Sequence, residues 1–117
     1  MNVEQLRLDL ERDEGCVYAI YLDHLNLPTF GIGHLVKEAD PEHGQPVATK
    51  VSKDRVMQVF NSDIESVIDD CTRSFSDFEA LPEAVQLVVA NMMFNLGLPR
   101  FSRFKKMIRA MELGDWQ

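Results

Sequence analysis

The spacing of apolar residues changes twice along this chain of 117 residues, and this change limits the folds that the chain can adopt. Residues 3–14 carry apolar side chains at the three- and four-residue intervals of one helical face. Residues 16–34 lack that spacing and contain β-branched and aromatic residues on both sides of a polar turn, which is typical of a hairpin. Helical spacing returns after Ser52, a residue type that often caps a helix. The sequence therefore predicts an α+β protein.

We expect one domain over residues 1–117, with a small β-rich lobe at about 15–51 and helical segments at 1–14 and 52–117. The expected elements are helices at 3–14, 53–71, 84–96 and 104–113, strands at 16–21 and 29–34, and a short third strand at the end of a polar loop, 37–50. The helix at 84–96 is apolar on nearly every side, which predicts that it is buried.

The last residues predict a helical lobe that continues past the end of this chain. Gly114 is placed to end one helix, and Asp115-Trp116-Gln117 is typical of the first turn of another. We therefore expect that C-terminal helices of the lobe are missing.

Composition excludes several classes of protein. The hydrophobic fraction of 45% and the charged fraction of 26% are ordinary for a globular protein. No apolar run is long enough to span a bilayer, and no signal peptide is visible, so we expect synthesis in the cytoplasm and no membrane insertion. Cys16 and Cys71 are too far apart to indicate a disulfide framework and are expected to be free thiols.

The charge of the chain makes a nucleic-acid partner a poor hypothesis. The formal net charge is −7, and residues 1–98 carry 7 Lys and Arg against 17 Asp and Glu. A polyanion-binding protein needs a broad basic face, and most of this chain is acidic.

Three side chains near the junction of the first helix and the hairpin could perform acid–base chemistry. Glu14 lies at the end of a helix, where the helix dipole raises the pKa of a carboxyl group, so it suits a general acid. Asp23 lies in the hairpin turn, where solvent and backbone N–H groups favour its ionised form. Thr29 begins the returning strand and could orient a water molecule. A neutral and an ionised carboxyl together are typical of glycosidases, although each residue alone also fits an ordinary helix end or turn.

The spacing of these residues resembles that of the T-even phage lysozymes, glycoside hydrolase family 24. The matching segments are Asp13-Glu14-Gly15, Asp23, Thr29, Gly31-Ile32-Gly33-His34-Leu35, Ser52-Lys53-Asp54, Phe60-Asn61-Ser62-Asp63 and Asn91-Met92-Met93-Phe94-Asn95-Leu96-Gly97. The resemblance covers essentially the whole chain and implies a lysozyme-like fold.

The resemblance implies a muramidase that cleaves the β-1,4 bond between N-acetylmuramic acid and N-acetylglucosamine with inversion, without a metal or cofactor. Glu14 would be the general acid, Asp23 would activate water, and Thr29 would hold that water. Inversion implies carboxyl groups about 6.5–9.5 Å apart. Leu35 and Phe94 match residues that contact the sugar.

The resemblance also implies roles for residues outside the acid–base group. Phe104 stands where the family carries a serine that contacts the sugar. His34 and Asp63 would form a structural ion pair. His24 and His43 lie in loops without the spacing of metal ligands, so no metal site is expected.

The partner implied by the family is bacterial peptidoglycan, and the implied role is lysis of a bacterial cell, as by a phage endolysin acting on the cell wall. The expected loss of C-terminal helices leaves an alternative open, a weakly active or inactive module that binds peptidoglycan or has a structural role. It also leaves open self-association through exposed C-terminal helices.

Overall fold

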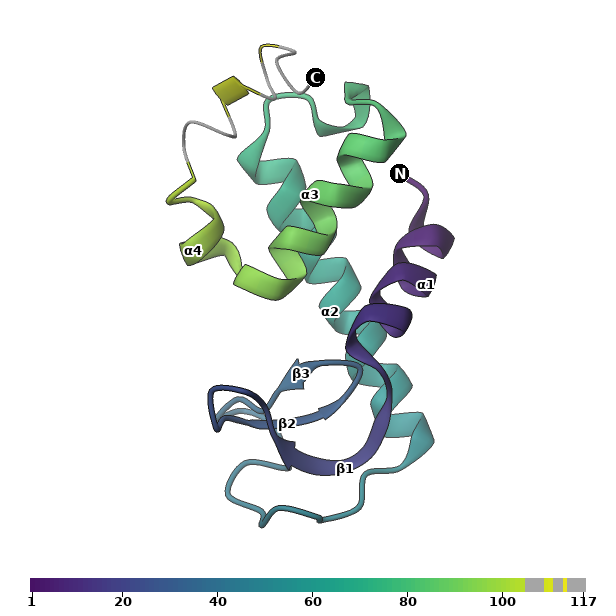
Figure 1. The fold of residues 1–117 in the computed structure, drawn as a ribbon, viewed down its shortest axis with the longest axis vertical. Helices are drawn as coiled ribbons and strands as arrows, with labels where there is room; N and C mark the ends of the chain where they lie inside the picture. Colours follow the sequence, from purple (N-terminus) through teal and green to yellow (C-terminus); the bar gives the residue numbers. More distant parts are fainter. Residues whose placement is uncertain (105–108, 111–112, 114–117) are drawn as a thin grey trace. The chain divides into compact units, whose positions relative to one another are not determined.

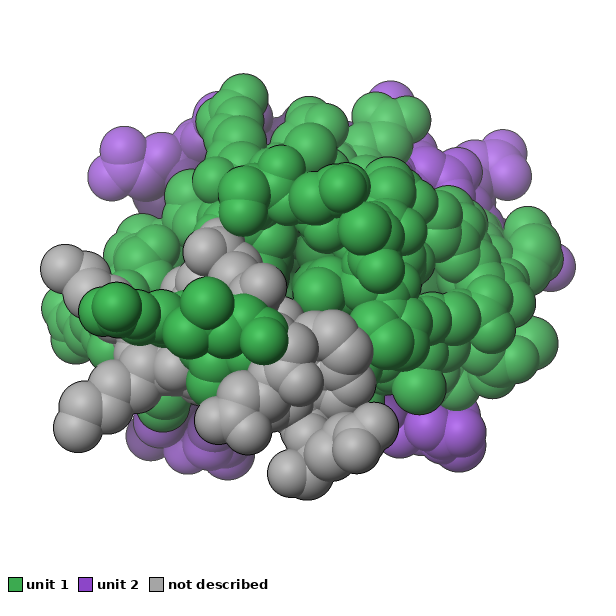
Figure 2. All heavy atoms as spheres, turned by 90° about the horizontal axis from the view of Figure 1, so that it is seen from above, with its two compact units in different colours: residues 1–9, 64–117 green, residues 10–63 purple. Residues whose placement is uncertain are grey.

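The computed structural model describes residues 1–104, 109–110 and 113. The chain divides into two compact units, one formed by residues 1–9 and 64–117 and the other by residues 10–63 (Figure 2). The divisions fall inside two helices, α1 (Val3–Glu14) and α2 (Lys53–Ser74), so that each of these helices contributes to both units. The single domain expected over the whole chain stays a prediction.

The unit of residues 10–63 contains a small antiparallel sheet in the order β1-β2-β3 (Figure 1). Its strands are β1 (Val17–Leu22), β2 (Pro28–Gly31) and β3 (His34–Leu35). A sheet beside helices confirms the predicted α+β class. The short strand expected at the end of the loop is a single bridge, between Ala19 and Lys50.

The strand expected over residues 29–34 is wrong in one respect, because it is split by a turn. β2 ends at Gly31, and the chain turns through Ile32 and Gly33 before β3 begins. The φ angles of Gly31 and Gly33 are +65° and +64°, a region that residues with a side chain rarely adopt. The two glycines therefore form the turn that produces a third strand.

The pairing of the strands aligns three side chains in a row across the sheet. Tyr21 of β1 is opposite Thr29 of β2, and Thr29 is opposite Leu35 of β3. Directly opposite residues of an antiparallel sheet have their side chains on the same face. Tyr21, Thr29 and Leu35 therefore share one face of this sheet.

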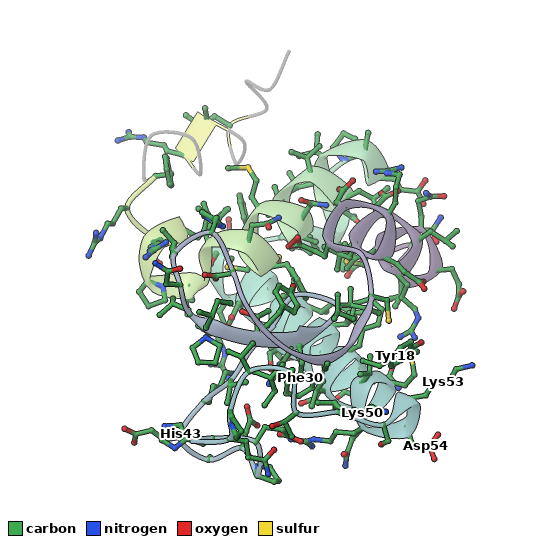
Figure 3. The ribbon with its side chains drawn as sticks, turned by 60° about the horizontal axis from the view of Figure 1, so that its bottom comes forward. Tyr18, Phe30, His43, Lys50, Lys53 and Asp54 are labelled. Atoms are coloured by element: carbon green, nitrogen blue, oxygen red, sulfur yellow. The ribbon has the colours of Figure 1, made fainter. Side chains whose placement is uncertain are left out.

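The core of this unit forms between the sheet and the first half of α2. A Cβ atom at Gly31 would lie only 3.0 Å from Cγ1 of Val56, so β2 and α2 pack in close contact. Phe30, labelled in Figure 3, belongs to this core. The buried apolar residues of the unit are Leu10, Ile20, Phe30, Ile32, Val51, Val56, Val59 and Phe60.

The other unit contains the end of α2, the 3₁₀ turn η1 (Phe78–Ala80), α3 (Glu83–Leu96) and α4 (Leu98–Phe101). Phe75 packs against Phe78 and Phe101, with ring centroids 6.0 and 6.1 Å apart. Its buried apolar residues are Leu6, Ile64, Val67, Cys71, Phe75, Phe78, Val89, Ala90, Met93 and Phe101.

Only one stripe of α3 is buried, so the expectation that this helix is buried on nearly every side is wrong. The buried side chains of α3 are Gln86, Val89, Ala90 and Met93, which recur at helical spacing. Val88, by contrast, is 54% exposed. Gln86 can be buried because its amide Nε2 donates hydrogen bonds to the carbonyls of Glu79 and Leu81, at 3.0 and 2.9 Å.

The structure changes the expected course of the chain after α3. Gly97, with φ +76°, ends α3, and Pro99 lies in the first turn of α4, a position where helices accept proline. Most of the helix expected at 104–113, and Asp115-Trp116-Gln117, lie outside the described residues.

Both cysteines are free, as expected, and they differ in environment. Cys16 is half-buried in the unit of residues 10–63, and Cys71 is buried in the other unit. Burial, with a smaller effect of Asp70, raises the pKa of the Cys71 thiol to about 12. Among the helices of the described residues, none has the length and apolar character needed to cross a membrane.

Candidate active site

Glu14 is the last residue of α1, and its side chain is half-buried against the turn between β2 and β3. A Cβ atom at Gly33 would lie 3.2 Å from Cγ and 3.3 Å from Cδ of Glu14. The missing side chain of Gly33 therefore leaves room for the carboxyl group.

The surroundings of Glu14 favour its protonated form. Burial raises the pKa of its carboxyl group above the usual value, the negative charge of Asp13 raises it further, and His24 lowers it in part. A carboxyl group that keeps its proton to higher pH suits a general acid.

Asp23 is fixed in the hairpin turn by the backbone. Its Oδ1 accepts hydrogen bonds from the N–H groups of Leu25 and Leu27, at 2.8 and 3.0 Å. Its own N–H donates to the carbonyl of Leu27 at 3.0 Å. The hydrogen bond from Leu27 is the main reason that the pKa of Asp23 is lowered, because donors stabilise the ionised carboxylate. Asp23 therefore remains a negatively charged acceptor.

Thr29 lies close to Asp23 through a shared backbone partner. Thr29 is only 4% exposed, and its hydroxyl donates a hydrogen bond of 3.0 Å to the carbonyl of Leu27. The backbone of Leu27 thus binds both Asp23 and Thr29. Because the hydroxyl proton is used in this bond, the oxygen of Thr29 is oriented as an acceptor.

The charges of Glu14 and Asp23 both act on the phenol of Tyr21. Burial raises the pKa of its phenol, and the charges of Glu14 and then Asp23 raise it further. The phenol of Tyr21 is therefore subject to the charges of both carboxyl groups. His24 likewise affects the pKa of both carboxyl groups, lowering each.

Tyr21 and His24 were not among the site residues predicted from the sequence. The signal for Tyr21 was weak, because it lies two positions before Asp23 but its place beside Thr29 follows only from the register between β1 and β2. His24 carries no comparable signal, since its effect depends on how the hairpin turn lies beside the end of α1.

The predicted sugar-contacting residues are divided between the two units. Leu35 lies on β3 beside Thr29 and is 44% exposed. Phe94 on α3 is half-buried, and Phe104 is 48% exposed; both belong to the unit of residues 1–9 and 64–117. The unit of residues 10–63 therefore brings together Glu14, Asp23, Thr29 and Leu35, but not the two phenylalanines.

His34 lies between two carboxylates. Its Nδ1 is 2.7 Å from Oδ2 of Asp63, and its Nε2 is 2.8 Å from Oδ2 of Asp40. When His34 is protonated, each ring nitrogen donates a hydrogen bond to one of these carboxylates. Burial lowers the pKa of His34, but the two carboxylates together raise it above the usual value.

The ion pair of His34 extends into a network that the sequence did not predict. Arg55 of α2 donates to both carboxylate oxygens of Glu42 at 2.9 Å, and its Nη2 lies 3.4 Å from Oδ1 of Asp40. Asp40 also accepts the N–H of Lys37 at 2.9 Å. The network therefore binds the loop after β3 to His34 and to α2, outside the group formed by Glu14, Tyr21, Asp23 and Thr29.

Within the part of the chain that the structure describes, no three His, Cys, Asp or Glu side chains are grouped so that they could hold a metal ion. His43, labelled in Figure 3, is exposed in the loop after β3.

Comparison with known proteins places these residues in a family. The sequence profile of the phage lysozyme family matches residues 11–117. The chain is 25% identical to the pre-baseplate central spike protein Gp5 of Enterobacteria phage T4, over 92% of this chain and 22% of that protein. It is 26% identical to the probable T4-type lysozyme 2 of Dictyostelium discoideum, over 97% of this chain and 78% of that protein. The chain thus spans about a fifth of the spike protein and most of the amoebal one.

Proposed function

Because this chain belongs to the phage lysozyme family, we propose that it is a muramidase that hydrolyses the β-1,4 bond between N-acetylmuramic acid and N-acetylglucosamine in bacterial peptidoglycan. One observation carries the proposal: Glu14 is held against Gly33 and Asp23 is held by backbone N–H groups of the hairpin turn, and their pKa values are displaced in opposite directions. A pair of carboxyl groups of this kind supplies one acid and one base at the same pH.

In the proposed reaction, Glu14 gives its proton to the glycosidic oxygen as the bond from that oxygen to the anomeric carbon breaks. Asp23 accepts a proton from a water molecule, whose oxygen forms the new bond to the anomeric carbon from the opposite face of the sugar. The product has inverted configuration, Glu14 is left ionised, and Asp23 is left protonated. Exchange of one proton each with solvent restores both groups.

Thr29 is proposed to hold the attacking water. Its hydroxyl proton is given to the carbonyl of Leu27, which leaves the oxygen to accept a hydrogen bond from water. Asp23 accepts a hydrogen bond from the N–H of Leu27, so the Thr29 oxygen and the Asp23 carboxylate are held in fixed positions relative to each other. Leu35, Phe94 and Phe104 are proposed to contact the sugars.

The substitution Glu14→Gln tests the acid. It preserves shape and removes the transferable proton, so we expect the release of reducing ends from purified peptidoglycan to fall by about 10²–10⁴-fold. Glu11→Gln is the matched control, because Glu11 is an exposed acidic residue of the same helix. Equal rates for the wild-type chain and Glu14→Gln would contradict the proposed role.

The same assay distinguishes the proposed enzyme from a binding module. A muramidase releases reducing ends and clears permeabilised Gram-negative cells, as in bacterial cell lysis. A module without turnover sediments with peptidoglycan and releases none, and this result would replace the proposed activity with peptidoglycan binding.

A further inference from the structure

Tyr21 occupies the end of the row that crosses the sheet through Thr29 to Leu35. Its position opposite Thr29 places its side chain on the face of the sheet that carries the water-holding and sugar-contacting residues proposed above. The side chain is half-buried. The strand pairing therefore places Tyr21 beside Thr29.

Of Glu14, Asp23 and Thr29, none keeps a hydrogen-bond donor free for the substrate throughout the proposed reaction. The ionised Asp23 only accepts, the hydroxyl of Thr29 donates to Leu27, and Glu14 gives its proton to the substrate. Burial, and then the charges of Glu14 and Asp23, raise the pKa of the Tyr21 phenol above its ordinary value, so the hydroxyl keeps its proton. Its O–H group is the neutral donor among these four side chains.

We propose that Tyr21 is a catalytic residue that contacts the substrate, donating a hydrogen bond from its neutral hydroxyl to an oxygen of the sugar at the cleaved linkage. The proposal rests on the proposed function, because it names a further residue of the same site. Saccharides offer suitable acceptors at this point in their ring, hydroxyl and N-acetyl oxygens. The ring of Tyr21 carries no charge, so the contact adds orientation without competing with the acid or the base.

The first experiment measures whether the charges of both carboxylates act on the phenol, independently of activity. The chain has two tyrosines, so Tyr18→Phe leaves Tyr21 as the one group that gives a phenolate absorbance change on titration. In this background, Glu14→Gln and Asp23→Asn should each lower the pKa of Tyr21. Glu11→Gln should leave it unchanged, because Glu11 acts on Tyr18. No change in either of the first two variants would overturn the proposal.

The second experiment measures the contact with substrate. Tyr21→Phe keeps the ring and removes the hydroxyl, and we expect kcat on peptidoglycan to fall about 3- to 10-fold with KM changed less than about twofold. Tyr18→Phe is the matched control on the same strand, since Tyr18 is exposed and lies where the backbone of β1 pairs with Lys50 and Val51 (Figure 3). We expect the control to retain the wild-type kcat.

The outcomes separate this proposal from the proposed function. If the wild-type chain hydrolyses peptidoglycan and Tyr21→Phe has the same kcat, this proposal alone is overturned. If the wild-type chain releases no reducing ends, both are overturned. A fall in kcat shared equally by Tyr18→Phe would indicate a structural effect on β1 and would also overturn the role of Tyr21.

Discussion

The pKa of the Glu14 carboxyl group is affected by a negatively charged neighbour and by a positively charged one. Asp13 and burial favour its protonated form, while His24 favours the ionised form. The proton that the proposed acid must supply therefore depends on neighbours that can be changed without touching Glu14.

The substitution Asp13→Asn should shift the pH dependence of hydrolysis. Removing a negative neighbour lowers the pKa of Glu14, so the acid loses its proton at lower pH and the alkaline limb of kcat/KM moves toward lower pH. Measuring kcat/KM from about pH 4 to 9 checks this result. Glu11→Gln, which removes a negative charge elsewhere on α1, should leave the limb in place; a shift toward higher pH for Asp13→Asn would contradict the argument.

Gly33 is required both for its backbone conformation and for the space that it leaves. Gly33→Ala and Gly44→Ala both place a side chain at positive φ, which costs about 1–2 kcal/mol in the free energy of unfolding. At Gly33 the new Cβ also meets Glu14 at 3.2 Å, whereas at Gly44 nothing lies within 4 Å.

We therefore expect both variants to lose stability in urea unfolding, Gly33→Ala the more because its Cβ also crowds Glu14, and a fall in hydrolysis for Gly33→Ala alone. Equal rates for the two variants would show that the position of Glu14 does not depend on Gly33.

At the scale of elements, the hydrogen bonds that join His34, Asp40 and Arg55 hold the loop after β3 in place. Asp63 and Asp40 raise the pKa of His34, so its contribution to stability is fully present below the ordinary histidine pKa and is lost as pH rises through the raised value. The pKa of Asp40 is lowered, although burial opposes this, because its hydrogen bonds with Lys37 and His34 favour the carboxylate. Its contribution is present above the ordinary aspartate pKa and is lost as pH falls through the lowered value.

His34→Gln should lower the free energy of unfolding by about 2–3 kcal/mol between about pH 4 and 6.5, where both contributions are present. The difference from the wild-type chain should shrink as the pH rises through the raised pKa of His34. Denaturant unfolding across this range checks both statements. His43→Gln, an exposed histidine of the same loop, is the control, and an equal loss for both variants would contradict the assigned role of the network.

Elements with regular apolar spacing were predictable from the sequence, and those fixed by distant contacts were not. The spacing along residues 3–14 predicted α1 with its observed end, because a helical face and a following glycine are local signals. The division of β2 from β3 was not predicted, since glycines inside an apolar run fit both a strand and a turn. The role of Asp40 was not predictable, because it depends on where the loop meets His34 and Arg55.

The candidate site, like the fold, was predictable in part from the sequence. Glu14, Asp23 and Thr29 were selected by their spacing, and their predicted roles depend on charge, hydrogen bonding and the resemblance. Tyr21 required the register between β1 and β2, which sequence spacing alone does not fix because the pairing is irregular between Val17 and Tyr21.

At the scale of the whole molecule, the two cysteines should differ strongly in reactivity. Because the pKa of Cys71 is about 12, its thiolate fraction near pH 8 is at least about a thousandfold below that of an ordinary thiol. Cys71 should therefore resist iodoacetamide in the folded chain, while Cys16 is modified. Mass spectrometry of the peptides after brief treatment checks this prediction, and equal modification of the two cysteines would contradict it.

The burial of Cys71 has a consequence for following unfolding. Cys71 belongs to the unit of residues 1–9 and 64–117, so its alkylation requires that unit to open and admit the reagent. When reclosing is fast, the rate of labelling reports the free energy of that opening in the absence of denaturant. A single native thiol thus supplies a site-specific probe of the helical unit, without an introduced label.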